Sequence, residues 1–207
     1  MPVEFEHTLK KMSGGPGQFA QIVGRLEVLP EDSESGFEFE DEIVGGRVER
    51  KFISAVCQGV AESLKRGPLG FEVVDVKMTL VDGKQHEKDS SEIAFRDCAA
   101  EAMRKIVFPK AKFVLLEPVM NLEIQVPGEF QGKITGHLGR KRGIVTSAEV
   151  NDGLCTIQAE VPLAELFDYA NDIRSMTQGR GQFSMTHCGY REVPKDIQDR
   201  VIRDRDN

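Results

Sequence analysis

Residues 144–161, IVTSAEVNDGLCTIQAEV, indicate the architecture of the second half of the chain. Two apolar runs, 144–150 and 154–161, flank the triplet Asn151-Asp152-Gly153. Runs of this kind joined by an Asp-Gly turn are typical of a β-hairpin. The flanking sequence predicts a strand at 119–126 and a helix at 128–143 before the hairpin, then a helix and a strand at 181–190 after it. This β-α-β-β-α-β order is that of the ferredoxin-like motif.

The helix after the hairpin is predicted from apolar residues at helical spacing. Pro162 is expected at its start, because proline is favoured in the first turn of a helix. The apolar stripe consists of Leu163, Leu166, Phe167, Ala170 and Ile173. The earlier helix at 128–143 contains three glycines, which lower its helical propensity.

The first half of the chain also mixes strands and helices. Strands are predicted at 3–11, 19–28, 37–40 and 71–83, the last one closing on an Asp82-Gly83 turn. Apolar residues at helical spacing predict a helix from Glu49 to Leu64 and another from Ser90 to Pro109. The fold class is therefore α+β. A domain at 1–115, a second at 116–195 and a short helical tail at 196–207 are expected.

Composition excludes several classes of protein. The 207 residues carry a net charge of −7, which argues against non-specific coating of nucleic acid but permits local RNA contacts from basic loops. No apolar run approaches the roughly 20 residues that span a bilayer. The four cysteines are scattered without a CxxC pair, so no metal site is predicted, and buried thiols in a reducing cytoplasm are expected.

The hexapeptide HEKDSS, residues 86–91, places a histidine, acids and serines side by side. A Ser-His-acid triad needs convergence in space, and the chain has no G-x-S-x-G elbow, so a hydrolase using His86 and Ser90 is disfavoured. A helix cap fits better. Asp89 is predicted as the N-cap with Glu92 completing a capping box, and Ser90 and Ser91 in the first turn. An exposed turn would leave His86, Glu87 and Lys88 free.

The second loop of interest is SGGPGQ, residues 13–18. A phosphate-binding P-loop requires G-x-x-x-x-G-K-[ST] between a strand and a helix, and no Gly-Lys-Ser or Gly-Lys-Thr occurs in the chain. Because both flanks of SGGPGQ are predicted strands, the loop is interpreted as a flexible β connection. No catalytic residue is predicted.

Several long strings together closely resemble the C-terminal part of the bacterial-type elongation factor G family. They include SGGPGQFAQ, VVDVKMTLVDGKQHEKDSSEIAFR and EVPLAELFDYANDIRSMTQGRGQFSM, in order along residues 5–195. The resemblance implies a fourth domain with a split βαβ fold like that of ribosomal protein S5, and a ferredoxin-like fifth domain. It also implies that GTP and Mg²⁺ bind an N-terminal GTPase domain of the parent protein. No cofactor is expected in this chain, which is interpreted as a fragment or a stand-alone paralogue.

The same resemblance implies that two loops meet at the tip of the fourth domain and enter the decoding centre of the ribosome. One loop is Ser13, Gly14, Gly15, Pro16, Gly17 and Gln18. The other is His86, Glu87, Lys88, Asp89, Ser90 and Ser91. In the fifth domain, contacts to rRNA or to another domain are predicted for Arg140, Lys141, Arg142, Arg174, Gln178 and Arg180.

The resulting hypothesis is an RNA-facing module of a cytoplasmic translocase that acts as a monomer on tRNA–mRNA. Its expected partners are rRNA and ribosomal proteins, with no membrane partner. Alternatives are the equivalent arm of a related GTPase for ribosome recycling or ribosomal protection, and a stand-alone ribosome-binding protein.

Overall fold

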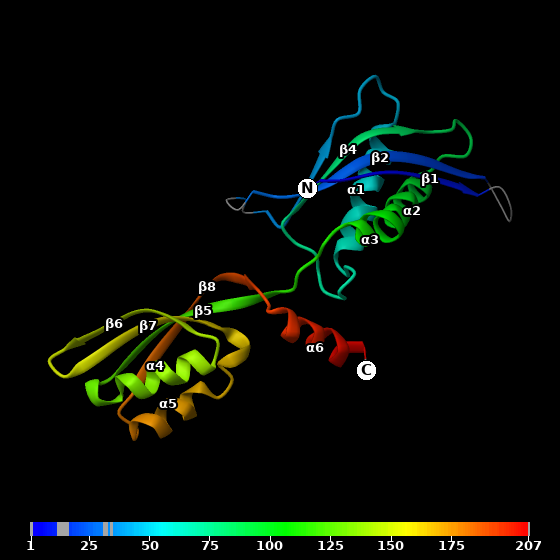
Figure 1. The fold of residues 1–207 in the computed structure, drawn as a ribbon. Helices are drawn as coiled ribbons and strands as arrows, with labels where there is room; N and C mark the ends of the chain where they lie inside the picture. Colours follow the sequence, from blue (N-terminus) through cyan, green and yellow to red (C-terminus); the bar gives the residue numbers. More distant parts are fainter. Residues whose placement is uncertain (1, 12–16, 31–32, 34, 207) are drawn as a thin grey trace. The chain divides into compact units, whose positions relative to one another are not determined.

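The computed structural model describes the chain except for residues 1, 12–16, 31–32, 34 and 207. It divides into two units, 1–113 and 114–207, each with its own sheet and apolar core (Figure 1). The boundary predicted from sequence followed residue 115.

Unit 1, residues 1–113, is built on a four-stranded sheet in the order β1-β2-β4-β3. Its strands are β1 (Val3–Lys11), β2 (Gln18–Val28), β3 (Phe37–Asp41) and β4 (Val76–Lys84). β1–β2 and β2–β4 pair antiparallel, whereas β3 and β4 are parallel, since helix α1 connects them as a crossover.

Two helices cover one face of this sheet (Figure 1). They are α1 (Arg50–Leu64) and α2 (Glu92–Ala102), the second continuing through a π-helical turn (Met103–Val107) into α3 (Phe108–Lys110). Phe52 and Phe95 stack between them with ring centroids 4.8 Å apart. At Gly59 the helices approach so closely that an added Cβ would lie 2.4 Å from the carbonyl oxygen of Arg96.

The predicted Asp82-Gly83 turn is wrong, because both residues lie inside β4. They pair with Val23 and Ile22 of β2, after a bulge that leaves Val81 unpaired. An added Cβ on Gly83 would lie 2.8 Å from the carbonyl oxygen of Gln21. Glycine is therefore required by the close approach of two strands and does not mark a chain reversal.

Unit 2, residues 114–207, confirms the ferredoxin-like order, and the predicted α+β fold class is confirmed for the chain. The strands form a fully antiparallel sheet in the order β6-β7-β5-β8. In chain order the elements are β5 (Leu116–Pro127), α4 (Gln131–Arg140), β6 (Ile144–Asn151), β7 (Leu154–Pro162), α5 (Tyr169–Thr177) and β8 (Gln182–Glu192). The hairpin turns on Asp152 and Gly153, with φ values of 50° and 80°, as a two-residue type I′ turn requires.

The helix predicted to begin at Pro162 begins later. A short 3-10 turn (Leu163–Glu165) comes first, and α5 starts at Tyr169. Phe167, predicted on the buried stripe, is 78% exposed, and Tyr169 is buried instead. Asp168 between them has a φ of 65°, and this left-handed residue breaks the helical period on which the prediction relied.

The tail forms α6 (Lys195–Asp206). It is tied to unit 2 at the start of β5. The backbone N–H of Leu115 donates to Oε1 of Gln198 at 3.0 Å, and the N–H of Val193 donates to the carbonyl of Leu115 at 2.8 Å.

Candidate RNA-contacting tip

Two loops meet at one end of the unit 1 sheet. The connection between β1 and β2 leaves the sheet at Lys11 and returns at Gln18, which are register partners. Of its predicted site residues, Ser13, Gly14, Gly15 and Pro16 lie outside the described residues, and Gly17 and Gln18 are described. The other loop follows β4 at the same end and carries residues 85–91 into α2.

Hydrogen bonds join the second loop to β2. The N–H of Phe19 donates to the carbonyl of Asp89 at 2.8 Å. The hydroxyl of Ser90 donates to the carbonyl of Phe19 at 2.7 Å and accepts from the N–H of His86 at 2.8 Å. An added Cβ on Gly17 would lie 2.6 Å from Oδ1 of Asp89. Ser90 and the small residue at position 17 thus bring the two loops into contact.

The cap predicted for α2 is wrong in its residues. Ser91 is the N-cap, with extended backbone angles and a hydroxyl that accepts from the N–H of Ala94 at 3.1 Å. Glu92 is the first helical residue, so the predicted capping box does not form. Asp89 and Ser90 lie before the helix and fasten the loop. The prediction that Ser90 and Ser91 occupy the first turn is also wrong.

The side chains of the second loop divide into paired and exposed groups. His86, expected to be free, has its Nδ1 3.0 Å from Oδ2 of Asp89. Glu87 and Lys88 are exposed. The Ser90 hydroxyl donates to a backbone carbonyl, which leaves it without the bond to a histidine that a nucleophilic serine needs. The loop is therefore arranged for surface contact and gives the hydrolase hypothesis no support.

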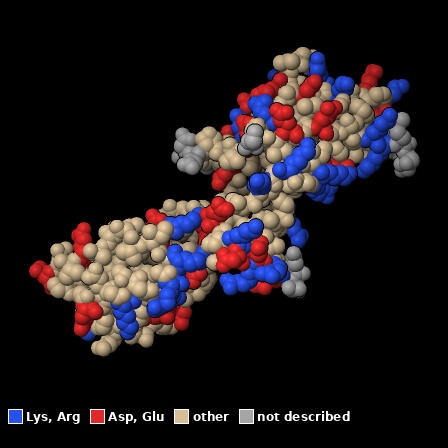
Figure 2. All heavy atoms as spheres, viewed as in Figure 1, with Lys and Arg blue, Asp and Glu red and all other residues tan. Residues whose placement is uncertain are grey.

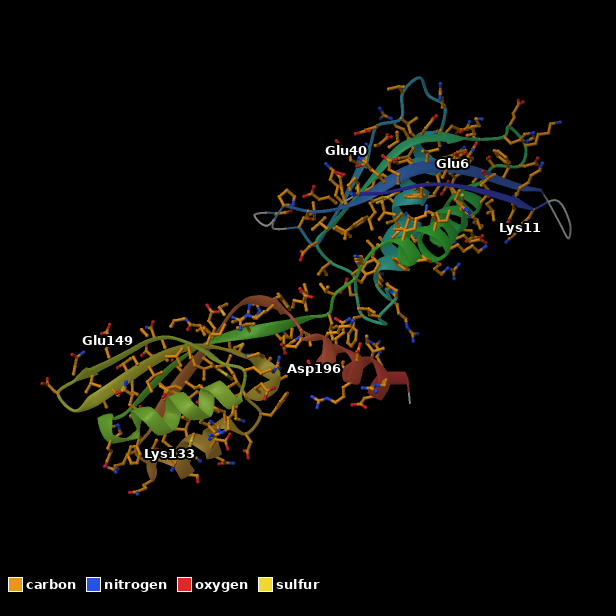
Figure 3. The ribbon with its side chains drawn as sticks, in the orientation of Figure 1. Glu6, Lys11, Glu40, Lys133, Glu149 and Asp196 are labelled. Carbon is orange, nitrogen blue, oxygen red and sulfur yellow. The ribbon has the colours of Figure 1, made fainter. Side chains whose placement is uncertain are left out.

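Charge changes along the sheet toward this end. Four exposed lysines surround the two loops, and none forms an ion pair with a carboxylate in the described part of the chain: Lys10, Lys11, Lys84 and Lys88. The same sheet carries acids farther away, as Figure 3 shows for Glu6 and Glu40 relative to Lys11. In Figure 2, Lys and Arg gather at this end beside the grey segment on the right. The basic end is suited to phosphate.

The cations predicted in unit 2 separate into two groups. Arg142 is half-buried and bound within the unit. Its Nη2 lies 2.9 Å from Oε2 of Glu117 and its Nε 2.8 Å from Oε1 of Glu165. The hydrogen bond to Glu117 raises the pKa of the guanidinium further. Lys141 lies 3.0 Å from Asp172 and also donates to the carbonyl of Glu165. These contacts favour a structural role for both cations.

The remaining predicted residues of unit 2 lie on its surface. Arg180 forms an exposed ion pair with Glu129 at 2.7 Å and lies over the ring of Phe130. Gln178 ends α5 in the left-handed conformation, with a φ of 55°. Arg140 and Arg174 are exposed and form no ion pair with a described carboxylate.

Sequence reasoning missed the basic rim and one aromatic residue at the tip. The face of the sheet that no helix covers carries Lys10, Lys84 and Phe19. The alternate residues of β2, Ala20 and Ile22, are buried and face the core. Buried and less buried residues alternate strictly along β2, and this pattern could have placed Phe19 on the uncovered face. The position of Lys84 depends on the pairing of β2 with β4, which is distant in sequence.

Comparison with a solved structure agrees with this architecture. A Thermus thermophilus protein, described as the crystal structure of ttk003000868, superposes with a TM-score of 0.85 at 34% identity, covering 99% of this chain and 30% of that one. The shared arrangement defines a pair of α+β domains found together inside a longer protein. Residues 1–112 match the family "Elongation factor G, domain IV", and residues 114–201 match "Elongation factor G C-terminus". The chain belongs to the elongation factor G family.

Relatives match over nearly the whole chain. Elongation factor G of Rhodopirellula baltica is 48% identical over 98% of it, and elongation factor G 2 of Bdellovibrio bacteriovorus is 43% identical over 96%. The mitochondrial elongation factor G of Drosophila pseudoobscura pseudoobscura is 43% identical over 98%. The chain spans only 29%, 28% and 27% of these proteins' lengths. No helix among the described residues is long and apolar enough to cross a bilayer.

Proposed function

We propose that this chain is the ribosome-engaging module of an elongation factor G, which promotes movement of tRNA and mRNA during protein synthesis. The observation that carries the proposal is the tip of unit 1, where exposed lysines surround two loops and hydrogen bonds fasten the second loop to β2. Its partners are rRNA, ribosomal proteins and the tRNA–mRNA duplex. It acts as a monomer in the cytoplasm, or in an organelle as the name of the mitochondrial relative indicates for that protein.

The chemistry of the tip suits A-form RNA. The minor groove of such a helix is wide and shallow and presents 2′-hydroxyl groups. Gly17 permits close approach of backbone, and Gln18 and Ser91 offer small polar groups. Lys88 and its neighbours supply positive charge for the phosphates. Because His86 is held by Asp89, its ring is positioned before RNA arrives, which lowers the entropic cost of contact.

The module contributes contacts and no chemical step. GTP and Mg²⁺ would bind a GTPase domain of the whole protein, which drives the movement. Among the described residues no three His, Cys, Asp or Glu side chains gather in a way that could hold a metal ion. Of the cations predicted as contacts in unit 2, Arg140 and Arg174 are exposed without an ion pair to a described carboxylate and are available for rRNA, with Gln178 close to Arg174 in sequence.

The proposal is tested by grafting this segment into a full-length elongation factor G and replacing His86 by alanine. Translocation should slow while ribosome-stimulated GTP hydrolysis stays near normal. Lys65→Ala is the control. The start of α1 lies beside the tip, because the N–H of Glu49 donates to the side chain of Gln85. Lys65 follows the other end of this 15-residue helix, about 22 Å away. Equal loss of both activities in the His86 variant would refute the tip assignment. Normal translocation with a loss of ribosome recycling would favour the recycling alternative.

A further inference from the structure

One aromatic ring lies among the cations of the tip. Phe19 projects from the uncovered face of β2, because Ala20 next to it is fully buried. Its register partner on β1 is Lys10. Lys84 of β4 pairs with Gln21, two residues along the same face, so a lysine stands on each side of the ring. The ring itself is half-buried.

An open depression of about 430 Å³ lies beside this ring. Its volume is within the range of about 300–1,000 Å³ that small-molecule sites occupy. The lining residues are Phe19, Arg47, Gly83, Lys84, Gln85 and His86. The His86 ring stands edge-on to Phe19, with centroids 6.2 Å apart and an interplanar angle of 61°. The wall therefore combines two aromatic rings with two cations.

Existing contacts hold this wall in place. Nη1 of Arg47 lies 2.7 Å from Oδ2 of Asp82, which fixes the guanidinium at the rim. The side chain of Gln85 accepts from the N–H of Glu49 at 2.9 Å. Gly83 contributes backbone to the lining, since a Cβ there would point toward the buried Val48, 2.9 Å from its Cγ2. These contacts within the protein hold the wall in place, and a preorganised wall favours binding.

Charge complementarity identifies the occupant. Farther from the tip, the face of the sheet that no helix covers carries acids such as Glu4, Glu6 and Glu40, which would repel phosphate. Arg25 and Lys77 on that part of the face are paired with Glu42 and Glu40, at 2.8 Å each, whereas Lys10 and Lys84 beside Phe19 form no ion pair with a described carboxylate. An aromatic side chain flanked by lysines on an open sheet is the arrangement that proteins use to stack an unpaired base while neutralising its phosphates.

We propose that this depression binds one unpaired nucleotide of single-stranded RNA. Phe19 stacks on the base, and Lys84 and Lys10 neutralise the phosphates on either side. The inference rests on the proposed function and adds a binding mode to it. The loop residues would contact paired RNA, while the Phe19 site would hold a nucleotide that has left the duplex.

The test measures binding of the 207-residue chain to two labelled RNAs by fluorescence anisotropy at low salt. One is an unstructured oligouridylate and the other a short RNA duplex. Phe19→Leu, which keeps an apolar side chain, should weaken oligouridylate binding about 5- to 150-fold, because each stacked base contributes that much affinity. Duplex binding should not change. Lys84→Gln should lower the salt dependence of oligouridylate binding by about 0.7 in the log–log slope.

Matched controls separate the site from general effects. Lys65→Gln makes the same charge change at the far end of α1, and Tyr190→Leu removes an exposed ring from unit 2. Both should bind oligouridylate like the unaltered chain. Circular dichroism melting checks that Phe19→Leu folds.

Three results would overturn the inference. They are no oligouridylate binding by the unaltered chain, unchanged binding by Phe19→Leu, and equal weakening of both RNAs. Any of these three results together with slowed translocation in the His86→Ala graft would refute the nucleotide site and leave the proposed function standing. The two failures are therefore distinguishable.

Discussion

The Ser90 hydroxyl connects two backbone groups of the tip, and replacement of Ser90 by alanine tests how the loop is held. Its hydroxyl accepts from the N–H of His86 and donates to the carbonyl of Phe19, at 2.8 and 2.7 Å. Ser90→Ala removes both bonds and leaves the two backbone groups to water. We expect the loop of residues 85–91 to open more often while the sheet and helices persist.

The size of the effect follows from the number of bonds. Each intramolecular hydrogen bond contributes a net of about 0.5–1.5 kcal/mol. Because the bond to His86 is exposed and the bond to Phe19 is only partly buried, the lower part of the range applies. Two bonds then contribute about 1–2 kcal/mol, so the amide of His86 should exchange about 5- to 30-fold faster in Ser90→Ala.

Hydrogen exchange followed by NMR or mass spectrometry measures this directly, and Ser91→Ala is the matched control. The control makes the same substitution one residue later, where the hydroxyl caps α2. It should lower the stability of unit 1 by about 1 kcal/mol without exposing the His86 amide selectively. The reasoning is refuted if His86 exchanges at the same rate in Ser90→Ala and the unaltered chain, or if both variants speed it equally.

Three further predictions concern the body of each unit. Gly59→Ala should destabilise unit 1 by about 1–3 kcal/mol in urea unfolding, because its methyl group would lie 2.4 Å from the carbonyl of Arg96. Cys188, which is exposed, should react with Ellman's reagent in the native protein. Cys98 should react only on unfolding, since burial raises the pKa of its thiol to about 12. Stability of unit 2 should fall as pH drops below about 6.5, because burial lowers the pKa of His137 and the unfolded chain then binds the proton more readily. His137→Gln should flatten that pH dependence in urea titrations.

Each of these has a result that would contradict it. Gly136→Ala is the control for helix propensity, because no described atom outside its own helix backbone and chain neighbours lies within 4 Å of its added Cβ, and it should stabilise α4 by up to about 1 kcal/mol. Equal effects at Gly59 and Gly136 would rule out a steric cause. Rapid labelling of Cys98 in the native state would contradict its burial. If the stability of unit 2 falls below pH 6.5 in His137→Gln as it does in the unaltered chain, other groups cause the pH dependence.

The elements that the sequence predicted well depend on local chemistry. The hairpin through Asp152 and Gly153 was predictable, because a two-residue turn with positive φ favours those residue types. The helical stripe of Phe52, Val56 and Val60 was predictable because one face of α1 packs on a sheet.

The errors arose where several residues could play one local role. Asp89, Ser90 and Ser91 are all good N-caps, and only the position of Phe19 decides that Ser90 bonds to β2 and Ser91 caps the helix. Asp82-Gly83 has the composition of a turn. Its place inside β4 follows from a bulge and a close approach to β2, which are non-local.

The candidate site was predictable in part and mostly through the family resemblance. That resemblance supplied the two loops. It did not supply the ring of Phe19 between Lys10 and Lys84, since these residues come from three strands and β4 is distant in sequence from the other two. Likewise, nothing local distinguished Arg142, bound by two carboxylates, from the exposed Arg140.

Contact between the tip of unit 1 and RNA on the ribosome underlies the whole proposed function. A photo-crosslinking amino acid placed at position 88 of the full-length graft, bound to ribosomes before translocation, reports that contact, with position 65 as the reference. We expect cross-links from position 88 to small-subunit rRNA, tRNA or mRNA that position 65 does not form. Equal RNA cross-linking from both positions, or none from position 88 while the graft remains bound, would contradict the proposed contact.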